Sequence, residues 1–446
     1  MSQTLNMTRG NPWKLLIRFS LPLMAANVFQ QMYTVIDTAI VGQGVGMDAL
    51  AALGCVDWLL WLILGIAYGF TQGFSVRVAQ KFGEGDQKGL QLFMGQSLVL
   101  SGILAVACAL LSQLCLPVLL WMLRVPEDLA PMAELYSRII FGGLPVVFFF
   151  NYCSAVLRAV GDSKTPLVAT AVASVTNIAL DLVAVFVLKW GIAGAAIATL
   201  IAQVLSGVIC LVKIVRTPQL RFQKSDLPLR RDIQINLVKI GSPAAIKNII
   251  ISVGGMVITS VVNTFGTTFI AGYIASAKLY GLLEIAALSY GYAITTYVGQ
   301  NYGANQPDRI KAGMKSAAVL AIGTSVLISA LMFLFGRPIT MLFISTENAA
   351  QAVEAGNVAY SYLCVMASFL PVLYTLYLFL FALQGLGDTV QPMISGGVEL
   401  VLRVGVAIVI AYTGYEMGIF GAEVVAWIGA AVYLGYHYFR RMKRGI

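Results

Sequence analysis

The two halves of this chain carry the same motifs in the same order, and this internal repeat constrains the fold more than any other feature. Leu144–Val146 reappears as Leu370–Val372, and the pair Gly161–Asp162 reappears as Gly387–Asp388. Two further matches are Gln80–Gly83 with Gln300–Gly303 and Pro22 with Pro243. Because the repeat extends over most of the chain, the sequence predicts two structurally similar units.

Long apolar runs fill both units. The 446 residues are 59% hydrophobic and 11% charged, whereas an ordinary soluble protein is about 25% charged. Apolar runs of roughly 20 residues, each long enough to cross a bilayer as a helix, recur about twelve times. We therefore predict an all-α polytopic membrane protein with twelve transmembrane helices. Residues 1–11 are polar, and we expect no removable signal peptide.

The twelve predicted helices form two sets of six. The first set covers 13–42, 49–80, 90–120, 130–157, 165–188 and 192–214, and the second covers 237–264, 268–301, 311–336, 355–383, 391–413 and 419–440. Six spans per set leave both sets in the same orientation, so the copies should be related as a parallel internal repeat, which is typical of membrane transporters. We expect a six-helix N-lobe over 1–214, a linker over 215–236 and a six-helix C-lobe over 237–446.

Prolines recur inside the predicted helices at matching places in the two lobes, Pro22 with Pro243 and Pro145 with Pro371. Each proline removes an intrahelical hydrogen bond and permits a bend. A packing kink and a part in conformational change explain these prolines equally well.

Basic residues mark one side of the membrane. On that side lie the N-terminus and the Lys and Arg residues of alternate loops: Lys81, Lys88, Arg158, Lys164, Arg216, Arg221, Lys224, Arg230, Arg231, Arg309, Lys311, Arg440, Arg441, Lys443 and Arg444. The other side has little beyond Arg124, Lys189 and Arg337. The positive-inside rule then predicts a plasma (inner) membrane protein with both termini and the linker in the cytoplasm. Because the net charge of +9 is distributed in this way, we expect the lipid bilayer as a partner and no nucleic acid.

Acidic side chains within the first lobe's helices are candidates for function, since a charge in hydrocarbon costs at least about 2.5–3.5 kcal/mol. A rise of about 1.5 Å per residue places Asp37 and Asp181 at a depth similar to that of Thr199. Asn177 and Asp181 are spaced i, i+4 and share a helix face. These side chains predict a cation site formed by Asp37, Asn177, Asp181 and Thr199.

Two ions suit such a site. Carboxylate, amide and hydroxyl oxygens are hard ligands, which favours Na⁺ as the bound metal. Two neighbouring carboxylates also repel each other, so one of them can take up a proton, and the coupling ion can be H⁺ instead. The competing explanation is that both acids are merely buried and hydrogen-bonded to neighbours, which is costly without a basic partner nearby.

The repeat supplies an internal control for this site. Its four positions align with the C-lobe as Asp37 with Ile258, Asn177 with Arg403, Asp181 with Ala407 and Thr199 with Ala426. The second lobe has lost every cation ligand, and Arg403 would repel a cation. We therefore expect one cation site, in the N-lobe.

The C-lobe carries a different set of charges within its helices: Lys247, Lys278, Glu284, Glu399, Arg403 and Glu423. Glu399 and Arg403 are spaced i, i+4, which predicts an intrahelical salt bridge. The simplest interpretation is a network whose charges neutralise one another. The alternative is that Lys247, Lys278 or Arg403 faces a central cavity and binds a negatively charged group of the substrate.

Polar residues near Asp37 suggest a path for the substrate. Gln30, Tyr33 and Asp37 are spaced three and four apart and share one face of their helix. Amide side chains are costly in lipid, so this face should meet protein or water. Together with Asn151, these residues either contact the substrate or brace neighbouring helices.

Motifs for enzymatic chemistry are missing from the sequence. His437 is the only histidine, the six cysteines form no C-x-x-C pair, and no Walker-type phosphate loop occurs. We expect no enzymatic activity, no cofactor and no direct use of ATP.

Together these residues resemble the multidrug and toxic compound extrusion (MATE) family. The similarity rests on Asn11–Leu15, Asp37, the Gln80 and Gln300 motifs and the doubled Leu-x-x-x-Gly-Asp-x-x-x-Pro element. It covers essentially the whole chain. The resemblance implies two six-helix lobes around a central cavity. It also implies export of small organic or xenobiotic compounds by antiport with Na⁺ or H⁺ and alternating access.

One branch of the family has its cation site in the N-lobe, made by an Asp on the first helix, an Asn-x-x-x-Asp pair on the fifth and a Thr on the sixth. The resemblance assigns these roles to Asp37, Asn177, Asp181 and Thr199. Another branch adds a Glu on the seventh helix, where Ser242–Lys247 of this chain has no acid and ends in a lysine. Cation coupling through the C-lobe is therefore not expected.

Other functions fit parts of the same pattern. The closest alternative is a lipid or lipid-linked oligosaccharide flippase of the same broad fold, or an exporter of an anionic metabolite, because Lys247, Lys278 and Arg403 suit an anionic cargo. A major-facilitator transporter shares the number of helices, but its usual basic loop is not matched by residues 81–88. We expect the protein to bind a small-molecule substrate and to function as a monomer.

Overall fold

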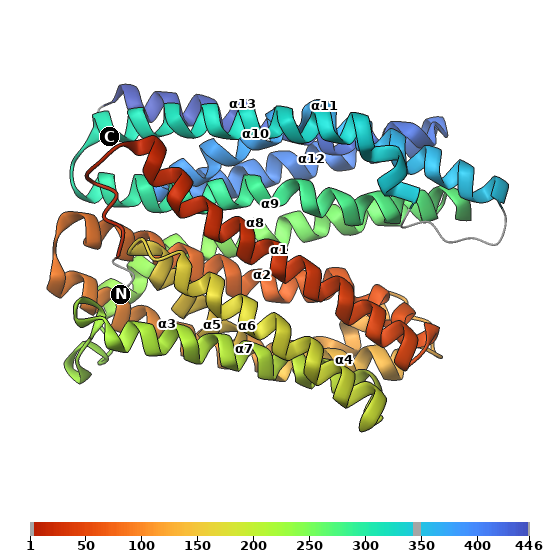
Figure 1. Ribbon diagram of the computed structural model, residues 1–446, viewed down its shortest axis with the longest axis horizontal. Coiled ribbons are helices and arrows are strands. Elements are labelled where there is room, and N and C mark those ends of the chain that lie inside the picture. Colours follow the sequence, from red (N-terminus) through yellow and green to blue (C-terminus); the bar gives the residue numbers. More distant parts are fainter. Residues whose placement is uncertain (1–3, 342–348, 445–446) are drawn as a thin grey trace.

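A computed structural model of the protein describes residues 4–341 and 349–444, and the regular elements within these ranges are all helical. Figure 1 shows two bundles of long helices lying side by side, with both chain termini at the same end of the molecule. We call this end the termini end and the opposite one the far end.

The first bundle, the N-lobe, contains α1 (Pro12–Gly44), α2 (Met47–Glu84), α3 (Gln87–Met122), α4 (Ala130–Gly142), α5 (Leu144–Ala159), α6 (Lys164–Leu182), the π-helix η1 (Val183–Val187) and α7 (Gly191–Arg216). The connector contains the 3₁₀ helices η2 (Pro218–Leu220) and η3 (Lys224–Asp226). The second bundle, the C-lobe, contains α8 (Arg231–Val262), α9 (Thr267–Gly303), α10 (Pro307–Met341), α11 (Ala349–Gly385), α12 (Val390–Thr413), the 3₁₀ helix η4 (Glu416–Phe420) and α13 (Gly421–Lys443).

Twelve spans arise from these helices within the described part of the chain. Ten helical segments are long and apolar enough to cross a membrane, and the bent pair α4–α5 makes an eleventh. The twelfth is α1, which has 33 residues. The mean hydropathy of α1 is lower than that of the other spans because Asn27, Gln30 and Gln31 interrupt its apolar sequence. The predicted arrangement of two six-helix lobes is thus confirmed.

Each predicted helix range corresponds to a helical span, but the range 130–157 is wrong as a single helix. It divides into α4 and α5, which meet near Gly143 with a bend of 48°. Pro145 explains the break, because it lies in the first turn of α5 and has no N–H with which to continue the hydrogen bonds of α4. Its repeat partner Pro371 lies inside the unbroken α11. The C-lobe also begins earlier than predicted, because α8 already starts at Arg231.

The two lobes are in close contact along α2 and α8. A Cβ placed on Gly69 would lie 2.4 Å from the Cα of Ala245, and one on Gly73 would lie 2.6 Å from the Cα of Gly241. No side chain fits at such distances, so the two helices pack backbone against backbone. This contact joins the lobes through the middle of the molecule.

Helix α1 is shared between the lobes. Leu16, Phe19 and Leu23, in its first half, belong to the hydrophobic core of the C-lobe. Val41, near its other end, belongs to a core cluster of the N-lobe. The middle of α1 therefore passes from one lobe to the other, and Figure 1 shows it crossing the bundle diagonally.

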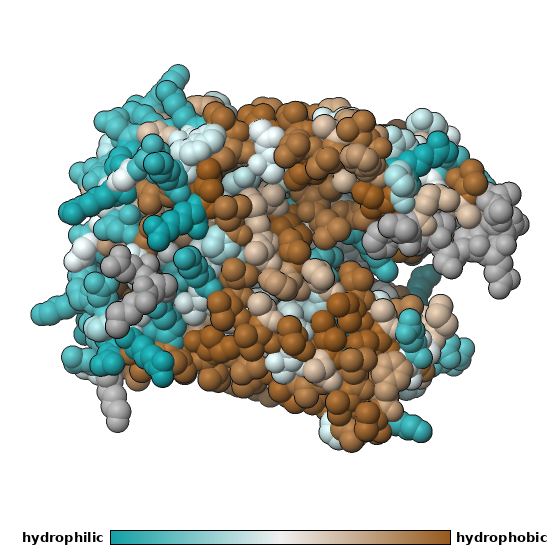
Figure 2. Space-filling view, viewed as in Figure 1, coloured by the Kyte–Doolittle hydropathy of each residue, from teal (hydrophilic) through white to brown (hydrophobic). Residues whose placement is uncertain are grey.

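The surface matches a protein surrounded by lipid. Figure 2 shows a wide hydrophobic band across the middle and hydrophilic residues at the termini end. Large apolar side chains are exposed on the long helices, such as Leu114 and Trp121 on α3 and Leu334 on α10. Exposed apolar residues on this scale are stable only in contact with lipid or another apolar surface. Figure 2 also shows the molecule hollowed between the lobes at the far end.

Candidate functional site

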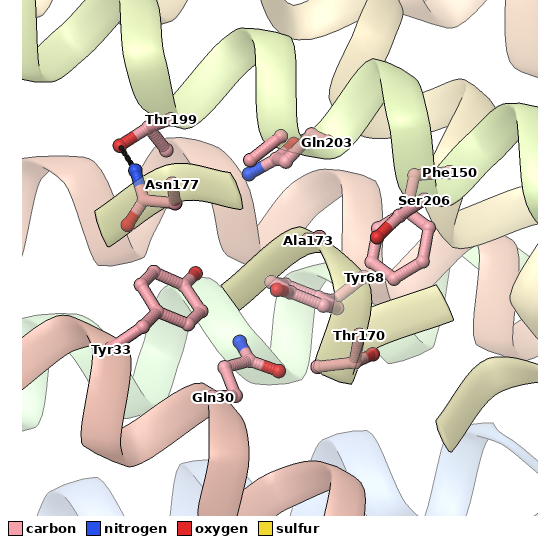
Figure 3. A pocket seen from close by; sticks show the side chains of 11 residues that line it. Gln30, Tyr33, Tyr68, Phe150, Thr170, Ala173, Asn177, Thr199, Gln203 and Ser206 are labelled. Carbon is pink, nitrogen blue, oxygen red and sulfur yellow. Dashed lines mark hydrogen bonds between the residues drawn. The ribbon is translucent and has the colours of Figure 1, made fainter. Parts of the chain in front are cut away.

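The four residues predicted to bind a cation come from three N-lobe helices. Asp37 lies on α1, Asn177 and Asp181 lie on α6, and Thr199 lies on α7. Asn177 is 1% exposed and Asp181 is 0% exposed, while Asp37 and Thr199 are half-buried. The Nδ2 of Asn177 donates a hydrogen bond of 3.5 Å to the Oγ1 of Thr199 (Figure 3). The fold thus brings α6 and α7 together at the predicted residues.

The local backbone around Asp181 is unusual. One residue after it, α6 ends at Leu182 and continues as the π-helix η1. Wider π-type turns inside helices occur frequently at functional sites. Helix α7 then begins at Gly191, whose φ of +59° suits glycine better than any other residue. These two features turn the chain so that α7 returns alongside α6.

Unpaired oxygen atoms concentrate at this place. Asp37 Oδ1, Asn177 Oδ1 and both carboxylate oxygens of Asp181 are buried and accept no hydrogen bond from the described part of the chain. The carboxyl groups of Asp37 and Asp181 lie within interaction range of each other. Buried polar atoms are almost always paired, and two close carboxylates repel. The arrangement is satisfied chemically by a cation between the oxygens or by a proton shared between the two acids.

A cavity of about 400 Å³, counted with the space open to solvent, adjoins these residues. Its lining includes the predicted residues Gln30, Tyr33, Asn177 and Thr199. In Figure 3, Gln30 and Tyr33 extend from α1 toward α6 and α7. Asn177 and Thr199 therefore link the cavity to the paired carboxylates.

Four polar lining residues were not predicted from the sequence, namely Tyr68, Thr170, Gln203 and Ser206. Helical spacing could have identified three of them. Thr170 lies seven residues before Asn177, and Gln203 and Ser206 lie four and seven residues after Thr199, so each shares a helix face with a predicted residue. Tyr68 lies on α2, and no spacing relates it to the others.

Asn151 is placed differently from the other predicted residues. It is 5% exposed, and its Nδ2 donates to the backbone oxygen of Val147 on the same helix, α5. The neighbouring Phe150 lines the cavity, whereas Asn151 is not among the lining residues. A direct role for Asn151 in substrate binding stays a prediction.

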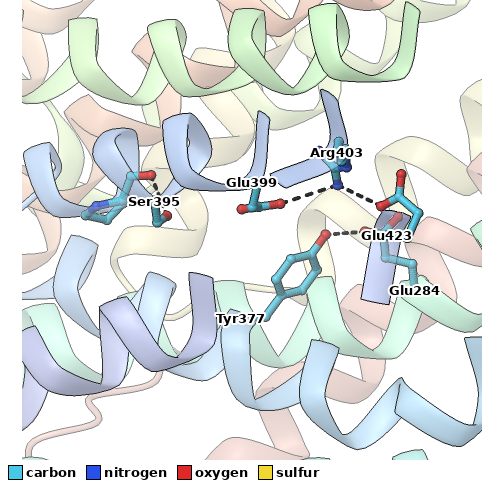
Figure 4. A network of polar contacts seen from close by, with 7 residues as sticks. Glu284, Tyr377, Ser395, Glu399, Arg403 and Glu423 are labelled. Atoms are coloured by element: carbon cyan, nitrogen blue, oxygen red, sulfur yellow. Dashed lines mark hydrogen bonds and ion pairs between the residues drawn. The ribbon is translucent and has the colours of Figure 1, made fainter. Parts of the chain in front are cut away.

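The C-lobe charges form a compact network in place of an open site. Arg403 pairs with Glu399 at 3.4 Å on its own helix, as predicted, and with Glu423 of α13 at 2.7 Å. Nearby, the hydroxyl of Tyr377 donates to Glu284 (Figure 4). The sequence did not reveal these last two contacts, because each joins residues of different helices.

The two predicted lysines lie in different surroundings. Lys247 is 8% exposed and lies within electrostatic range of Glu399 and Glu284, but it forms no ion pair within 4 Å among the described residues. Lys278 is exposed on α9, within electrostatic range of Asp57 on α2 of the other lobe. Contact of either lysine, or of Arg403, with substrate stays a prediction.

Two six-helix lobes, a cavity beside buried acids and a lipid-facing surface define a multi-pass membrane transporter. Similarity to known proteins narrows this class further. The MatE family model matches residues 22–183 and 243–409, which is one segment in each lobe. The chain belongs to the MatE family, the multidrug and toxic compound extrusion transporters.

Individual proteins agree with this assignment. The probable multidrug resistance protein YpnP of Bacillus subtilis (strain 168) is 30% identical over 342 residues, which cover 77% of each chain. The probable multidrug resistance protein NorM of Thermotoga maritima is 25% identical over 424 residues, which cover 93% of this chain and 88% of that protein. A solved structure, described as the outward-facing conformation of a multidrug resistance MATE family transporter, has a TM-score of 0.91 at 24% identity and covers 100% of this chain and 99% of its own.

Proposed function

We propose that the protein exports small organic or xenobiotic compounds by antiport with Na⁺ or H⁺, and that Asp37, Asn177, Asp181 and Thr199 bind the coupling ion. The observation that carries this proposal is the set of buried oxygens on Asp37, Asn177 and Asp181 that accept no hydrogen bond within residues 4–341 and 349–444. The printed names of the relatives, as multidrug resistance proteins, support the kind of cargo.

The donor set suits a monovalent ion. It offers two carboxylates, one amide oxygen and one hydroxyl, all hard oxygen ligands of the kind that hold alkali and alkaline-earth cations. Within residues 4–341 and 349–444, no group of three His, Cys, Asp or Glu side chains could hold a metal ion. The same two carboxylates can instead share one proton, so the site accommodates either coupling ion.

Coupling requires that the ion bind the two arrangements of the lobes with different affinity. Asp37 and Asp181 lie on α1 and α6, and α1 also packs into the C-lobe core through Phe19 and Leu23. An ion that holds Asp37 close to Asp181 therefore acts on a helix that belongs to both lobes. Substrate is taken up from one side of the cavity, and ion binding from the other side favours its release there.

The protein acts in this proposal as a multi-pass protein of the plasma membrane, with both termini in the cytoplasm. The basic residues of the termini end support the orientation, because positively charged loops remain on the cytoplasmic side. The structure, with its hollow at the far end, then corresponds to a state open to the outside. We propose that it functions as a monomer, binds a small molecule and the bilayer, and catalyses no reaction.

The test is transport in proteoliposomes with imposed Na⁺ or pH gradients. We expect a gradient of one ion to drive export by the parent protein and Asp37→Asn to abolish the driven component while the protein still folds and binds substrate. Export by Asp37→Asn that equals the parent's would contradict the assignment of the ion site. The gradient that drives the parent protein identifies the ion.

A second candidate function is export of an anionic metabolite or flipping of a lipid-linked anion. The exposed Lys278 and the buried Lys247, which has no ion pair within 4 Å among the described residues, favour it. Cationic and anionic compounds tested in parallel separate the two functions. If Lys247→Ala and Lys278→Ala leave transport of the anionic compounds unchanged, the second function fails.

A further inference from the structure

Two glutamines join the lobes reciprocally at the termini end. The Nε2 of Gln80, on α2, donates to the backbone oxygen of Gly385 in the C-lobe at 3.0 Å. The Nε2 of Gln300, on α9, donates to the backbone oxygen of Ala159 in the N-lobe at 2.9 Å. Gln80 is 3% exposed and Gln300 is 0% exposed. Both the donors and the acceptors are equivalent positions of the internal repeat.

Each acceptor is the last residue of a helix. Helix α5 ends at Ala159 and α11 ends at Gly385, and the final carbonyls of a helix have no partner within it. Each glutamine therefore caps the end of a helix in the other lobe. Separating the lobes here leaves two carbonyls and two amide groups without their partners unless water replaces them.

The glycines of the same motif allow this contact. A Cβ placed on Gly83 would lie 1.9 Å from the backbone oxygen of Gln300, and one on Gly303 would lie 2.0 Å from the backbone oxygen of Gln80. The ends of α2 and α9 thus touch at the backbone. The repeated Gln-x-x-Gly sequence supplies a hydrogen-bond donor and the close approach that lets it reach its acceptor.

The N-terminal segment before α1 reinforces only one side of this contact. The backbone N–H of Met7 donates to the Oε1 of Gln300 at 2.8 Å. Asn301 and Arg309 donate to the backbone oxygen of Met7 at 3.1 and 3.0 Å, and Met7 is fully buried. On the other side, the Oε1 of Gln80 accepts instead from Arg77 at 2.8 Å, within its own helix.

We propose that the doubled Gln-x-x-Gly motif is the gate at the termini end, held shut by the two reciprocal glutamine bonds, and that the segment around Met7 locks the Gln300 half. The gate separates whenever the lobes open toward the termini. This inference rests on the alternating-access part of the proposed function, but it does not depend on the ion site. Gln80 and Gln300 act here as positioning residues that set the balance between the two arrangements of the lobes.

The test measures the distance between the lobes at the termini end. Spin labels at Lys88→Cys and Lys311→Cys, two exposed positions on α3 and α10, report this distance in a variant without native cysteines. We expect Gln80→Met and Gln300→Met, which keep the side-chain shape but lose the donor, each to increase the population with separated lobes about tenfold.

Gln113→Met is the matched control, because the Nε2 of Gln113 also donates to a helix carbonyl, that of Arg138, but within the N-lobe. It should leave the distance distribution unchanged. Deletion of residues 2–10 should add to the effect of Gln80→Met and add little to that of Gln300→Met, since Gln300 is the one of the two glutamines that bonds to Met7.

Distances are measured without substrate or ion gradient, so their outcome is independent of the ion site. Folding is checked by the melting temperature of each variant. Folded Gln80→Met and Gln300→Met proteins with the parent's distance distribution would overturn the proposal. If the distances shift in the Gln80→Met and Gln300→Met proteins while Asp37→Asn still exports normally, the gate is supported and the assigned ion site is wrong.

Discussion

The two lobes contain polar clusters at equivalent positions of the repeat, and in one cluster the charges are paired whereas in the other the acidic oxygens are not. In the C-lobe, Arg403 is paired with Glu399 and Glu423. In the N-lobe, the equivalent of Arg403 is Asn177, and Asn177 Oδ1 and both carboxylate oxygens of Asp181 have no hydrogen-bond partner among the described residues. One lobe therefore carries its own cation as a side chain, and in our proposal the other takes a cation from solution.

The cation of the C-lobe cluster is a permanent part of the protein, whereas a cation bound at the N-lobe cluster could exchange with solution. A guanidinium stays protonated at any physiological pH and cannot leave its carboxylates. An ion held by Asp37, Asp181 and Asn177 can leave, and only an ion that leaves can couple a gradient to a conformational change. We therefore propose that the C-lobe cluster maintains structure and that the N-lobe cluster binds the ion used in transport. Each of the following variants tests one side of this contrast.

The largest effect is expected from Asp181→Asn. An amide in place of the carboxylate removes the charge that attracts the ion, so gradient-driven export should fall by about 100-fold. Initial rates of export from proteoliposomes measure this loss. Asp48→Asn, which changes an exposed acid at the start of α2, is the control and should export like the parent. If Asp181→Asn still exports at the parent's rate when a gradient is imposed, the N-lobe cluster does not bind the coupling ion.

Arg403→Met should instead affect stability. It leaves Glu399 and Glu423 without their cation in a mostly buried place, so the free energy of unfolding should fall by about 3–5 kcal/mol. Thermal unfolding in detergent measures the change, and the exposed Arg337→Met serves as the control. Adding Glu399→Gln and Glu423→Gln should restore much of the loss. An unchanged melting temperature for Arg403→Met would show that the network does not stabilise the C-lobe.

Thr199→Val should weaken ion binding to a smaller degree. It removes one oxygen and the acceptor of the Asn177 amide but leaves both carboxylates, so the apparent ion affinity should fall about fivefold. The ion concentration at half-maximal export rate reports this affinity. Thr176→Val, one residue before Asn177 and half-buried, should leave it unchanged. If the parent, Thr199→Val and Thr176→Val proteins have equal ion affinities, Thr199 is not part of the ion site.

Lys278→Ala should have the smallest effect on the fold. Its side chain is exposed and has no ion pair within 4 Å among the described residues, so the free energy of unfolding should stay within about 0.5 kcal/mol of the parent value. Transport of cationic compounds should also be unchanged. A clear loss of stability would show that Lys278 takes part in an interaction that stabilises the fold.

Local geometry explains how much of this could be predicted from the sequence. The spacing of Glu399 and Arg403 on one helix predicted their ion pair, and the same spacing placed Asn177 beside Asp181. The pairing of Arg403 with Glu423 could not be read in this way, because it depends on how two helices pack.

The reciprocal bonds of Gln80 and Gln300 were hidden for the same reason. Their repetition was evident in the sequence, but their acceptors are backbone atoms more than a hundred residues away, which carry no signature of their own. The break at Gly143 is a further case, since Pro371, in the matching position, interrupts nothing. Periodicity and pairing rules predict contacts within one helix. The contacts between helices depend on packing and could not be predicted in this way.

The contact of α2 with α8 has a mechanical consequence. Gly69 and Gly73 hold these helices at backbone distance from Ala245 and Gly241, so the lobes have no room to approach further or to slide past side chains there. A close contact that prevents sliding still allows the two lobes to tilt about it. The contact then acts as a fulcrum: motion is least at these glycines, and opening one end of the molecule closes the other.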